Sequence, residues 1–281
     1  MKKRLIIVCG ILAVVALSKI SPCWGYLLPA EQLIQFVSER TAKVRNFRLD
    51  VVVESAAAES APIMVKKQAI VYASRPGFLR EQTVGGETAV TTLMNSGLRL
   101  SAVDGYLLRE QPRHEELILS SILLADSPQT LQRLLESEGV DLGQVHLARM
   151  GNRVAYVIGG SPRNSDIPQF WCDKESFWPL RLVGVRYGDQ ATDLVDVRFL
   201  AYRQINPEIW MPSIIEIYRQ GRLTKKLVVT ATAVNVKFPA RTFDLEAFAA
   251  KYPPLPPPSV PPEQSGQGLD QMRRYLEKKY E

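Results

Sequence analysis

The chain has 281 residues, of which 35 are lysine or arginine and 29 are aspartate or glutamate, so its formal net charge is +6. The surplus lies at the N-terminus: residues 1–25 carry four basic and no acidic side chains, which leaves 31 basic and 29 acidic residues afterwards. This balance argues against the strongly basic surface that nucleic-acid binding needs. The remaining length is sufficient to bury a good hydrophobic core.

Residues 1–25 have the pattern of a secretory signal peptide. Lys2, Lys3 and Arg4 precede an uncharged apolar run over residues 5–17. This run is shorter than the roughly 20 residues that cross a bilayer, and it matches the apolar region of a signal peptide. We therefore predict export of the chain after cleavage behind Gly25. An uncleaved N-terminal anchor is the alternative.

The cysteine content excludes a disulfide framework in the exported chain. Cys9 and Cys23 lie within the predicted signal peptide, and Pro22 before Cys23 argues against lipidation, which needs a small residue there. Only Cys172 remains, and a single cysteine forms neither an internal disulfide nor a cysteine metal site. We expect its thiol to be buried.

A helix is predicted first, over residues 30–44, with Pro29 in a position that helices favour at their start. The apolar period then changes to two: Phe47, Leu49 and Val51 alternate with polar residues, which predicts a half-buried antiparallel strand. Further strand-like segments follow at short spacing, with Asp104-Gly105 as a strong hairpin signal. They cover residues 63–73, 78–83, 88–94, 98–103 and 106–109.

Residues 115–138 are predicted to form two helices, divided at Ser127 and Pro128. The first is apolar on more than one narrow stripe, so we expect it to be enclosed on most sides. Strands then resume. They cover residues 144–149, 154–159, 169–173, 180–186, 193–202, 210–218 and 223–236.

These elements predict an α+β fold that is mainly β. We expect a curved antiparallel half-barrel of roughly eleven or twelve strands, with helices covering its concave face, because twisted open sheets rarely exceed about 10 strands without curling. This domain is assigned to residues 26–250. A Pro-rich linker in extended conformation follows over residues 251–267, and a C-terminal amphipathic helix over residues 268–281.

The sequence lacks the motifs of common catalytic and cofactor sites. His114 and His146 lie in different predicted elements without metal-ligand spacing, and neither a G-x-S-x-G elbow nor a phosphate-binding loop is present. We therefore predict that the protein is not an enzyme and binds no cofactor or metal.

Four motifs, in this order and spacing, resemble those of the LolA-like outer-membrane lipoprotein-sorting proteins. An Arg-Pro turn leads into a strand at residues 74–80 (SRPGFLR), and an Asp-Gly turn follows at residues 103–108 (VDGYLL). Residues 173–182 (DKESFWPLRL) and 209–218 (IWMPSIIEIY) are also similar in style. The resemblance covers about residues 30–245.

This resemblance implies a half-barrel whose helical lid encloses a hydrophobic space for acyl chains. It also implies that Arg75, the arginine of the Arg-Pro turn, contacts the lid and holds it closed; a solvated turn arginine is the alternative. The other candidate residues are apolar, and ordinary core packing is the alternative for each. They are Leu117, Ile118, Ile122 and Leu123 for the lid, and Phe47, Leu49, Val51, Phe78 and Phe199 for the concave wall.

The predicted function is that of a periplasmic carrier, which binds acyl chains of lipoproteins or lipids and delivers them to the outer membrane. The expected partners are those acyl chains and a protein of the inner or outer membrane, without nucleic acid and without a transmembrane span in the mature chain. One alternative is a regulatory sensor of mislocalised lipoproteins. Another is a structural envelope protein whose cavity is filled by its own side chains.

Overall fold

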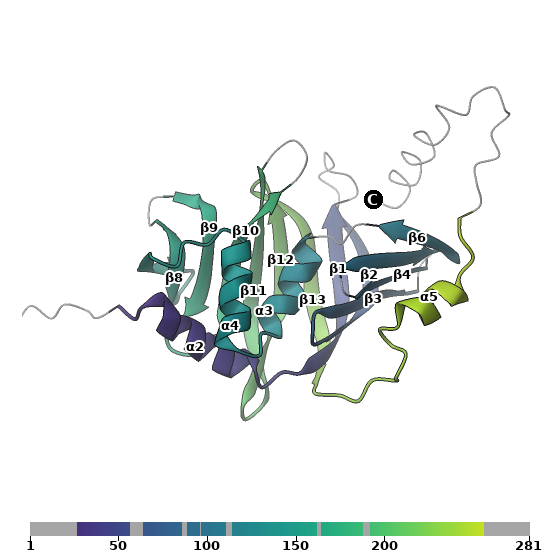
Figure 1. Cartoon of the computed structure of the whole chain (residues 1–281), viewed down its shortest axis with the longest axis horizontal. Helices are drawn as coiled ribbons and strands as arrows, with labels where there is room; N and C mark the ends of the chain where they lie inside the picture. Colours follow the sequence, from purple (N-terminus) through teal and green to yellow (C-terminus); the bar gives the residue numbers. More distant parts are fainter. Residues whose placement is uncertain are drawn as a thin grey trace, which may run out of the picture.

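The computed structural model describes residues 27–56, 64–85, 89–95, 97–110, 114–161, 164–187 and 192–255. The predicted signal peptide, the predicted C-terminal helix and most of the predicted Pro-rich linker lie outside these residues. Helices and strands are labelled as in Figure 1.

The described residues form one antiparallel sheet of thirteen strands, in the order β6-β5-β4-β3-β2-β1-β13-β12-β11-β10-β9-β8-β7. The number of strands exceeds the expected eleven or twelve because every segment predicted to be strand-like forms a separate strand of the sheet. The strands are β1 (Asn46–Ala56), β2 (Met64–Ser74), β3 (Phe78–Val84), β4 (Val90–Asn95), β5 (Leu98–Val103), β6 (Tyr106–Glu110), β7 (Val145–Met150), β8 (Arg153–Ser161), β9 (Asn164–Asp173), β10 (Pro179–Tyr187), β11 (Thr192–Asn206), β12 (Ile209–Arg219) and β13 (Arg222–Val234).

Tight turns connect most neighbouring strands, as the sequence predicts. Asp104 and Gly105 join β5 to β6 with φ angles of 49° and 85°. Two positive φ angles are the requirement of the hairpin turn that an Asp-Gly pair favours.

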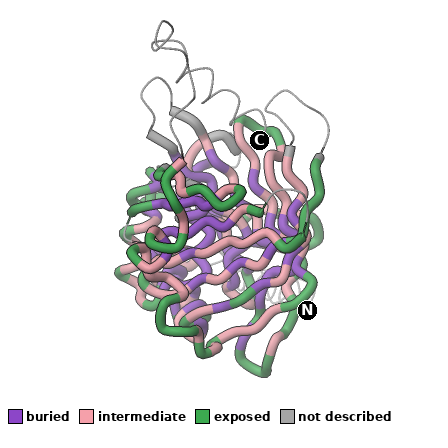
Figure 2. The backbone as a smooth tube through the Cα atoms, turned by 90° about the vertical axis from the view of Figure 1, so that its right-hand side faces the viewer, coloured by how far each residue is buried: buried purple, intermediate pink, exposed green. Residues whose placement is uncertain are grey.

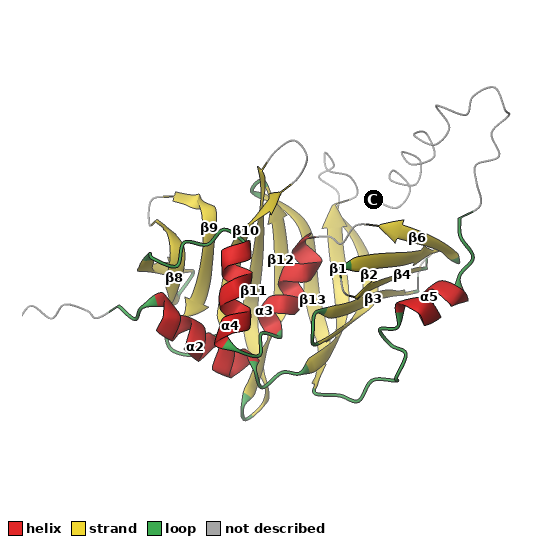
Figure 3. Ribbon diagram, viewed as in Figure 1, coloured by secondary structure: helices red, strands yellow, loops and turns green. Residues whose placement is uncertain are grey.

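The helices are α2 (Ala30–Thr41), α3 (His114–Leu123), α4 (Pro128–Ser137) and α5 (Leu245–Lys251). Because β6 and β7 are the two edges of the sheet, the chain between them must cross from one edge to the other, and α3 and α4 lie in this crossing. They pass in front of the sheet together with α2 (Figures 1 and 3). Ser127 caps α4 by accepting a hydrogen bond from the backbone N–H of Thr130.

The sheet curls around α3. This helix contacts β3 as well as β10 and β11, although five strand-to-strand steps separate β3 from β11 in the sheet. Five steps of about 4.8 Å would carry a flat sheet about 24 Å, well beyond the roughly 10 Å diameter of one helix. The predicted half-barrel with helices on its concave face is therefore confirmed.

The main hydrophobic core lies between this concave face and the helices α2, α3 and α4. Figure 2 shows the buried stretches of the backbone in the interior and the exposed stretches at the turns and the outer surface. A smaller cluster lies on the opposite face of the sheet, where α5 packs Phe248 against Leu93, Leu100 and Ala102. Just beyond α5, Pro253 accepts a hydrogen bond from the backbone of Leu107 in β6.

Candidate functional site

The strand register fixes which residues share the concave face. On β1, Phe47 lies beside Ala73 of β2, and the row continues through Leu79 of β3 to Met94 of β4. All four side chains belong to the main core. The centre of the concave face is therefore an apolar wall, as expected from the period-two pattern of β1.

Four of the five predicted wall residues lie on this wall. Phe47, Leu49 and Val51 project from β1, which lies next to the central strand β13, and are at most 2% exposed. Phe199 projects from β11 and is fully buried in the same cluster. The fold thus brings together residues that are about 150 positions apart in the sequence.

Phe78 lies on the other face of the sheet, which corrects the prediction. It pairs with Ser74, whereas its neighbour Leu79 pairs with Ala73 and takes the concave position. The Phe78 ring instead lies 5.7 Å from the ring of Phe243, in the segment that leads to α5. A shift of one residue in a strand moves a side chain to the opposite face, and Phe78 and Leu79 are both apolar, so the sequence pattern did not distinguish them.

Apolar side chains of helix α3 pack into the same core. Ile118, Ile122 and Leu123 are buried, and all three pack in the cluster that contains the wall residues. The side chain of Leu117 lies outside the described part of the structure. In this conformation the protein's own side chains occupy the space between α3 and the wall.

Two further helices contribute to the cover. Leu131 and Leu135 of α4 and Leu33 and Val37 of α2 are fully buried in the same cluster. These four leucine and valine residues were not among the predicted site residues, although their spacing of four residues within each helix is the signal of a core-facing helix stripe. From here on, the lid means α3 and α4.

Arg75 fastens the end of α3 and the end of α2 to the sheet. Its Nε donates to the carbonyl oxygen of Leu124, directly after α3, at 2.9 Å. Its Nη2 lies within hydrogen-bond distance of the carbonyl oxygens of Thr41, Ala42 and Val44, at 3.2, 3.0 and 2.7 Å. The last carbonyl groups of a helix lack hydrogen-bond donors within the helix. Here the Arg75 guanidinium provides donors at the ends of both α2 and α3.

The surroundings of Arg75 are partly desolvated. Burial lowers the pKa of its guanidinium, the neighbouring Asp126 carboxylate raises it, and Arg45 lowers it further. Thr41 reinforces the same junction, because its hydroxyl donates to the carbonyl oxygen of Ala125 at 2.7 Å. The geometry agrees with the expected contact between Arg75 and the lid.

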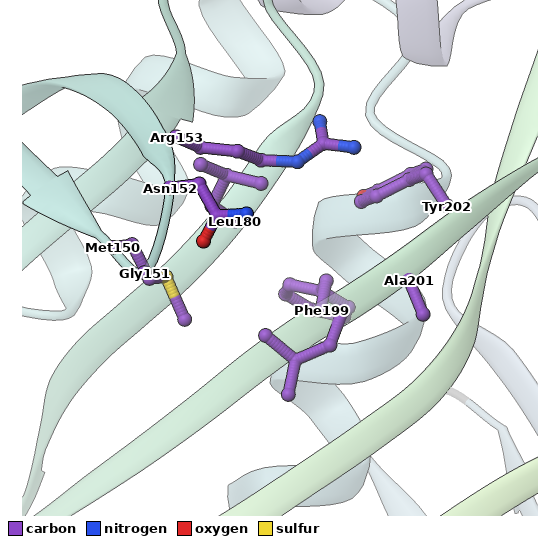
Figure 4. Close-up of a pocket in the computed structure, with 9 residues that line it drawn as sticks. Met150, Gly151, Asn152, Arg153, Leu180, Phe199, Ala201 and Tyr202 are labelled. Atoms are coloured by element: carbon purple, nitrogen blue, oxygen red, sulfur yellow. The ribbon is translucent and has the colours of Figure 1, made fainter.

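A pocket of about 260 Å³ opens beside the wall, next to Phe199 (Figure 4). Small-molecule sites usually measure about 300–1,000 Å³, so this pocket is small for a ligand with a long acyl chain. Access for such a chain would require the lid to move. The pocket is lined by Met150, Gly151, Asn152, Arg153, Leu180, Phe199, Leu200, Ala201 and Tyr202.

Cys172 is buried on β9 as expected, and burial together with the nearby Asp173 carboxylate raises the pKa of its thiol far above the ordinary value.

The described segments contain no group of three or more His, Cys, Asp or Glu side chains that could hold a metal ion. Within the same segments, every helix is too short or too polar to cross a membrane.

No protein-family model matches the sequence, and no curated protein matches it either. Solved structures do match its fold. A candidate outer membrane lipoprotein-sorting protein domain from Vibrio parahaemolyticus superposes with a TM-score of 0.51 at 13% identity, covering 78% of this chain and 99% of that domain. A LolA superfamily protein from Nitrosomonas europaea gives a TM-score of 0.49 at 12% identity, over 79% of this chain and 100% of the other. The curved, unclosed sheet and its helical cover, together with the first of these superpositions, show that the chain has a LolA-like fold.

Proposed function

We propose that the protein is a periplasmic carrier that binds acyl chains of lipoproteins or lipids between the concave wall and the lid, and delivers them to the outer membrane. The observation that carries this proposal is the shared apolar core: Phe47, Leu49 and Phe199 of the wall pack in one cluster with Ile118 and Ile122 of α3. The proposed activity is binding and release, without a chemical step.

The energetics of acyl chains require such a site. Exposure of an acyl chain to water costs about 0.8 kcal/mol per CH₂ group, so a chain of about 16 carbons costs roughly 12 kcal/mol. A carrier that crosses an aqueous compartment must therefore enclose the chain. It must also release the chain at an acceptor.

The lid can supply both properties. Because Ile118, Ile122 and Leu123 fill the space in the described conformation, an incoming chain has to displace them. The cost of moving the lid reduces the net affinity, since binding competes with the closed state. Arg75 sets part of this cost, because its hydrogen bonds hold the end of α3.

The proposal is tested with a neutral fluorescent dye that binds apolar sites, displaced by a synthetic acylated peptide. The same peptide without acyl chains is the matched control. We expect displacement only by the acylated peptide, followed by transfer of that peptide from the loaded protein to liposomes.

Failure of the acylated peptide to displace the dye would refute acyl-chain binding. Binding without transfer to liposomes would refute the carrier function while leaving the binding site intact.

A further inference from the structure

The concave face changes from apolar to polar along the strand order. The row that starts with Phe47 of β1 runs through Ala73, Leu79 and Met94 to Arg99 of β5, and ends at Glu110 of β6. At about 4.8 Å per strand, Arg99 lies about 19 Å along the face from Phe47. The apolar wall therefore has a charged end.

The next row shows the same change. Leu49 and Val71 are followed by Glu81 of β3, Thr92 of β4 and Ser101 of β5, before Leu108 of the edge strand β6. The hydroxyl groups of Thr92 and Ser101 lie 3.2 Å apart, and both residues are buried. A face that is apolar on one side and polar on the other has the pattern required by an amphiphile with a tail and a head.

Arg99 is enclosed at this polar end, and a carboxylate of the lid pairs with it. Its Nε donates to Oε2 of Glu116 at 3.1 Å, and the two side chains are only 7% and 10% exposed. Glu116 lies on α3, two residues before Ile118. The helix whose apolar side chains fill the cavity thus also carries the carboxylate that faces Arg99.

We propose that Arg99 binds the anionic group of an acyl-chain ligand, and that Glu116 takes this place when the lid is closed. The proposal rests on the proposed acyl-chain binding. Movement of α3 to admit a chain takes Glu116 away from a buried guanidinium, and loss of one partner of a buried ion pair is strongly unfavourable. An anionic head group replaces the lost partner, whereas an uncharged or zwitterionic one does so poorly.

The ion pair between Arg181 and Asp196 provides a comparison. It lies on the convex face, away from the lid, and its side chains are each 13% exposed. Nε of Arg181 lies 2.9 Å from Oδ1 of Asp196, a carboxylate that Arg198 also binds, and neither arginine is connected to the cavity. Arg181 is therefore a matched control position for Arg99.

Two kinds of ligand combine an acyl chain with an anionic group: phospholipids and acylated peptides. Displacement of the neutral dye is measured with two pairs of ligands on protein expressed from the full sequence. The first pair is monoacyl phosphatidylglycerol and monoacyl phosphatidylcholine with identical chains. The second is an acylated peptide with Asp or with Asn beside the acylated cysteine.

We expect the anionic member of at least one pair to bind about tenfold more tightly, the size of one charge-assisted hydrogen bond. Arg99→Met removes this preference, and Arg181→Met retains it. Glu116→Gln, which keeps Arg99 but removes the competing carboxylate, tightens binding of the anionic ligand only. This second variant keeps the test decisive if Arg99→Met does not fold.

Equal binding of both members in both pairs would overturn the role of Arg99 while leaving acyl-chain binding in place. A preference for the anionic member that persists in Arg99→Met, or that Glu116→Gln leaves unchanged, would also overturn it. Absence of displacement by all four ligands would refute the proposed function itself, and this inference with it.

Discussion

Replacement of Arg75 by methionine tests how strongly the lid is held. Its guanidinium is within hydrogen-bond distance of four carbonyl oxygens, those of Leu124, Thr41, Ala42 and Val44. Nε carries one hydrogen and Nη2 carries two, so about three of these contacts count as independent hydrogen bonds. At about 1 kcal/mol net for each bond, and with water able to reach some of the freed carbonyls, the variant should lose about 2–3 kcal/mol of unfolding free energy.

The assay combines urea unfolding with titration of the neutral dye. Arg45→Met is the matched control, because this side chain is exposed and an exposed substitution usually changes stability by no more than about 0.5 kcal/mol. Arg75→Met should also bind the dye more tightly, since a loosened lid competes less with the ligand. If Arg75→Met unfolds like the control and binds dye like the unaltered protein, Arg75 does not hold the lid.

Three further predictions concern the lid, its attachment and a buried carboxylate. Ile122→Ala should lose about 2–4 kcal/mol of unfolding free energy in urea, because Ile122 is fully buried, and it should nevertheless bind acyl chains more tightly; weaker binding would contradict competition by the lid. Gly184→Ala should lose about 1–3 kcal/mol, because the added Cβ would overlap the buried carboxylate of Glu138 at the end of α4; a smaller loss for Gly184→Ala when it is made in the Glu138→Ala background would identify that overlap as the cause, and an equal loss in both backgrounds would argue against it. Burial raises the pKa of Asp173, but hydrogen bonds, chiefly from Ser176, outweigh it and leave this pKa below its ordinary value. The stabilisation by this carboxylate is therefore complete above the pKa of an unfolded aspartate, about 4, and is lost as pH falls through the lower pKa of the folded protein. Asp173→Asn should be less stable than the unaltered protein at pH 7, with a smaller difference at pH 3, and an equal difference at both pH values would contradict this linkage.

Local sequence patterns were sufficient to locate the strands and the inward face of β1. Phe47, Leu49 and Val51 alternate with polar residues, and a period of two assigns such residues to one face without knowledge of the partner strands. The same pattern was ambiguous at Phe78 and Leu79, where two apolar residues follow a turn. Only the pairing of β3 with β2 determines which of them faces the lid.

The contacts that organise the candidate site depend on long-range pairing, which a local pattern does not reveal. The Arg-Pro turn pointed to Arg75, but its acceptors come from the end of α2 and from Leu124, which is 49 residues away. Arg99 and Glu116 carry no distinguishing motif. Their pairing depends on the crossing of α3 over the concave face.

The most direct test of the central claim is native mass spectrometry of the protein expressed from the full sequence, with lipid extraction of the same sample. Acyl-chain binding predicts additional species with the masses of acyl-chain ligands, which are released when the protein unfolds and are recovered in the extract. A ligand-free mass, without uptake of added phospholipid or acylated peptide, would contradict the proposal and indicate a structural protein whose interior is filled by its own side chains.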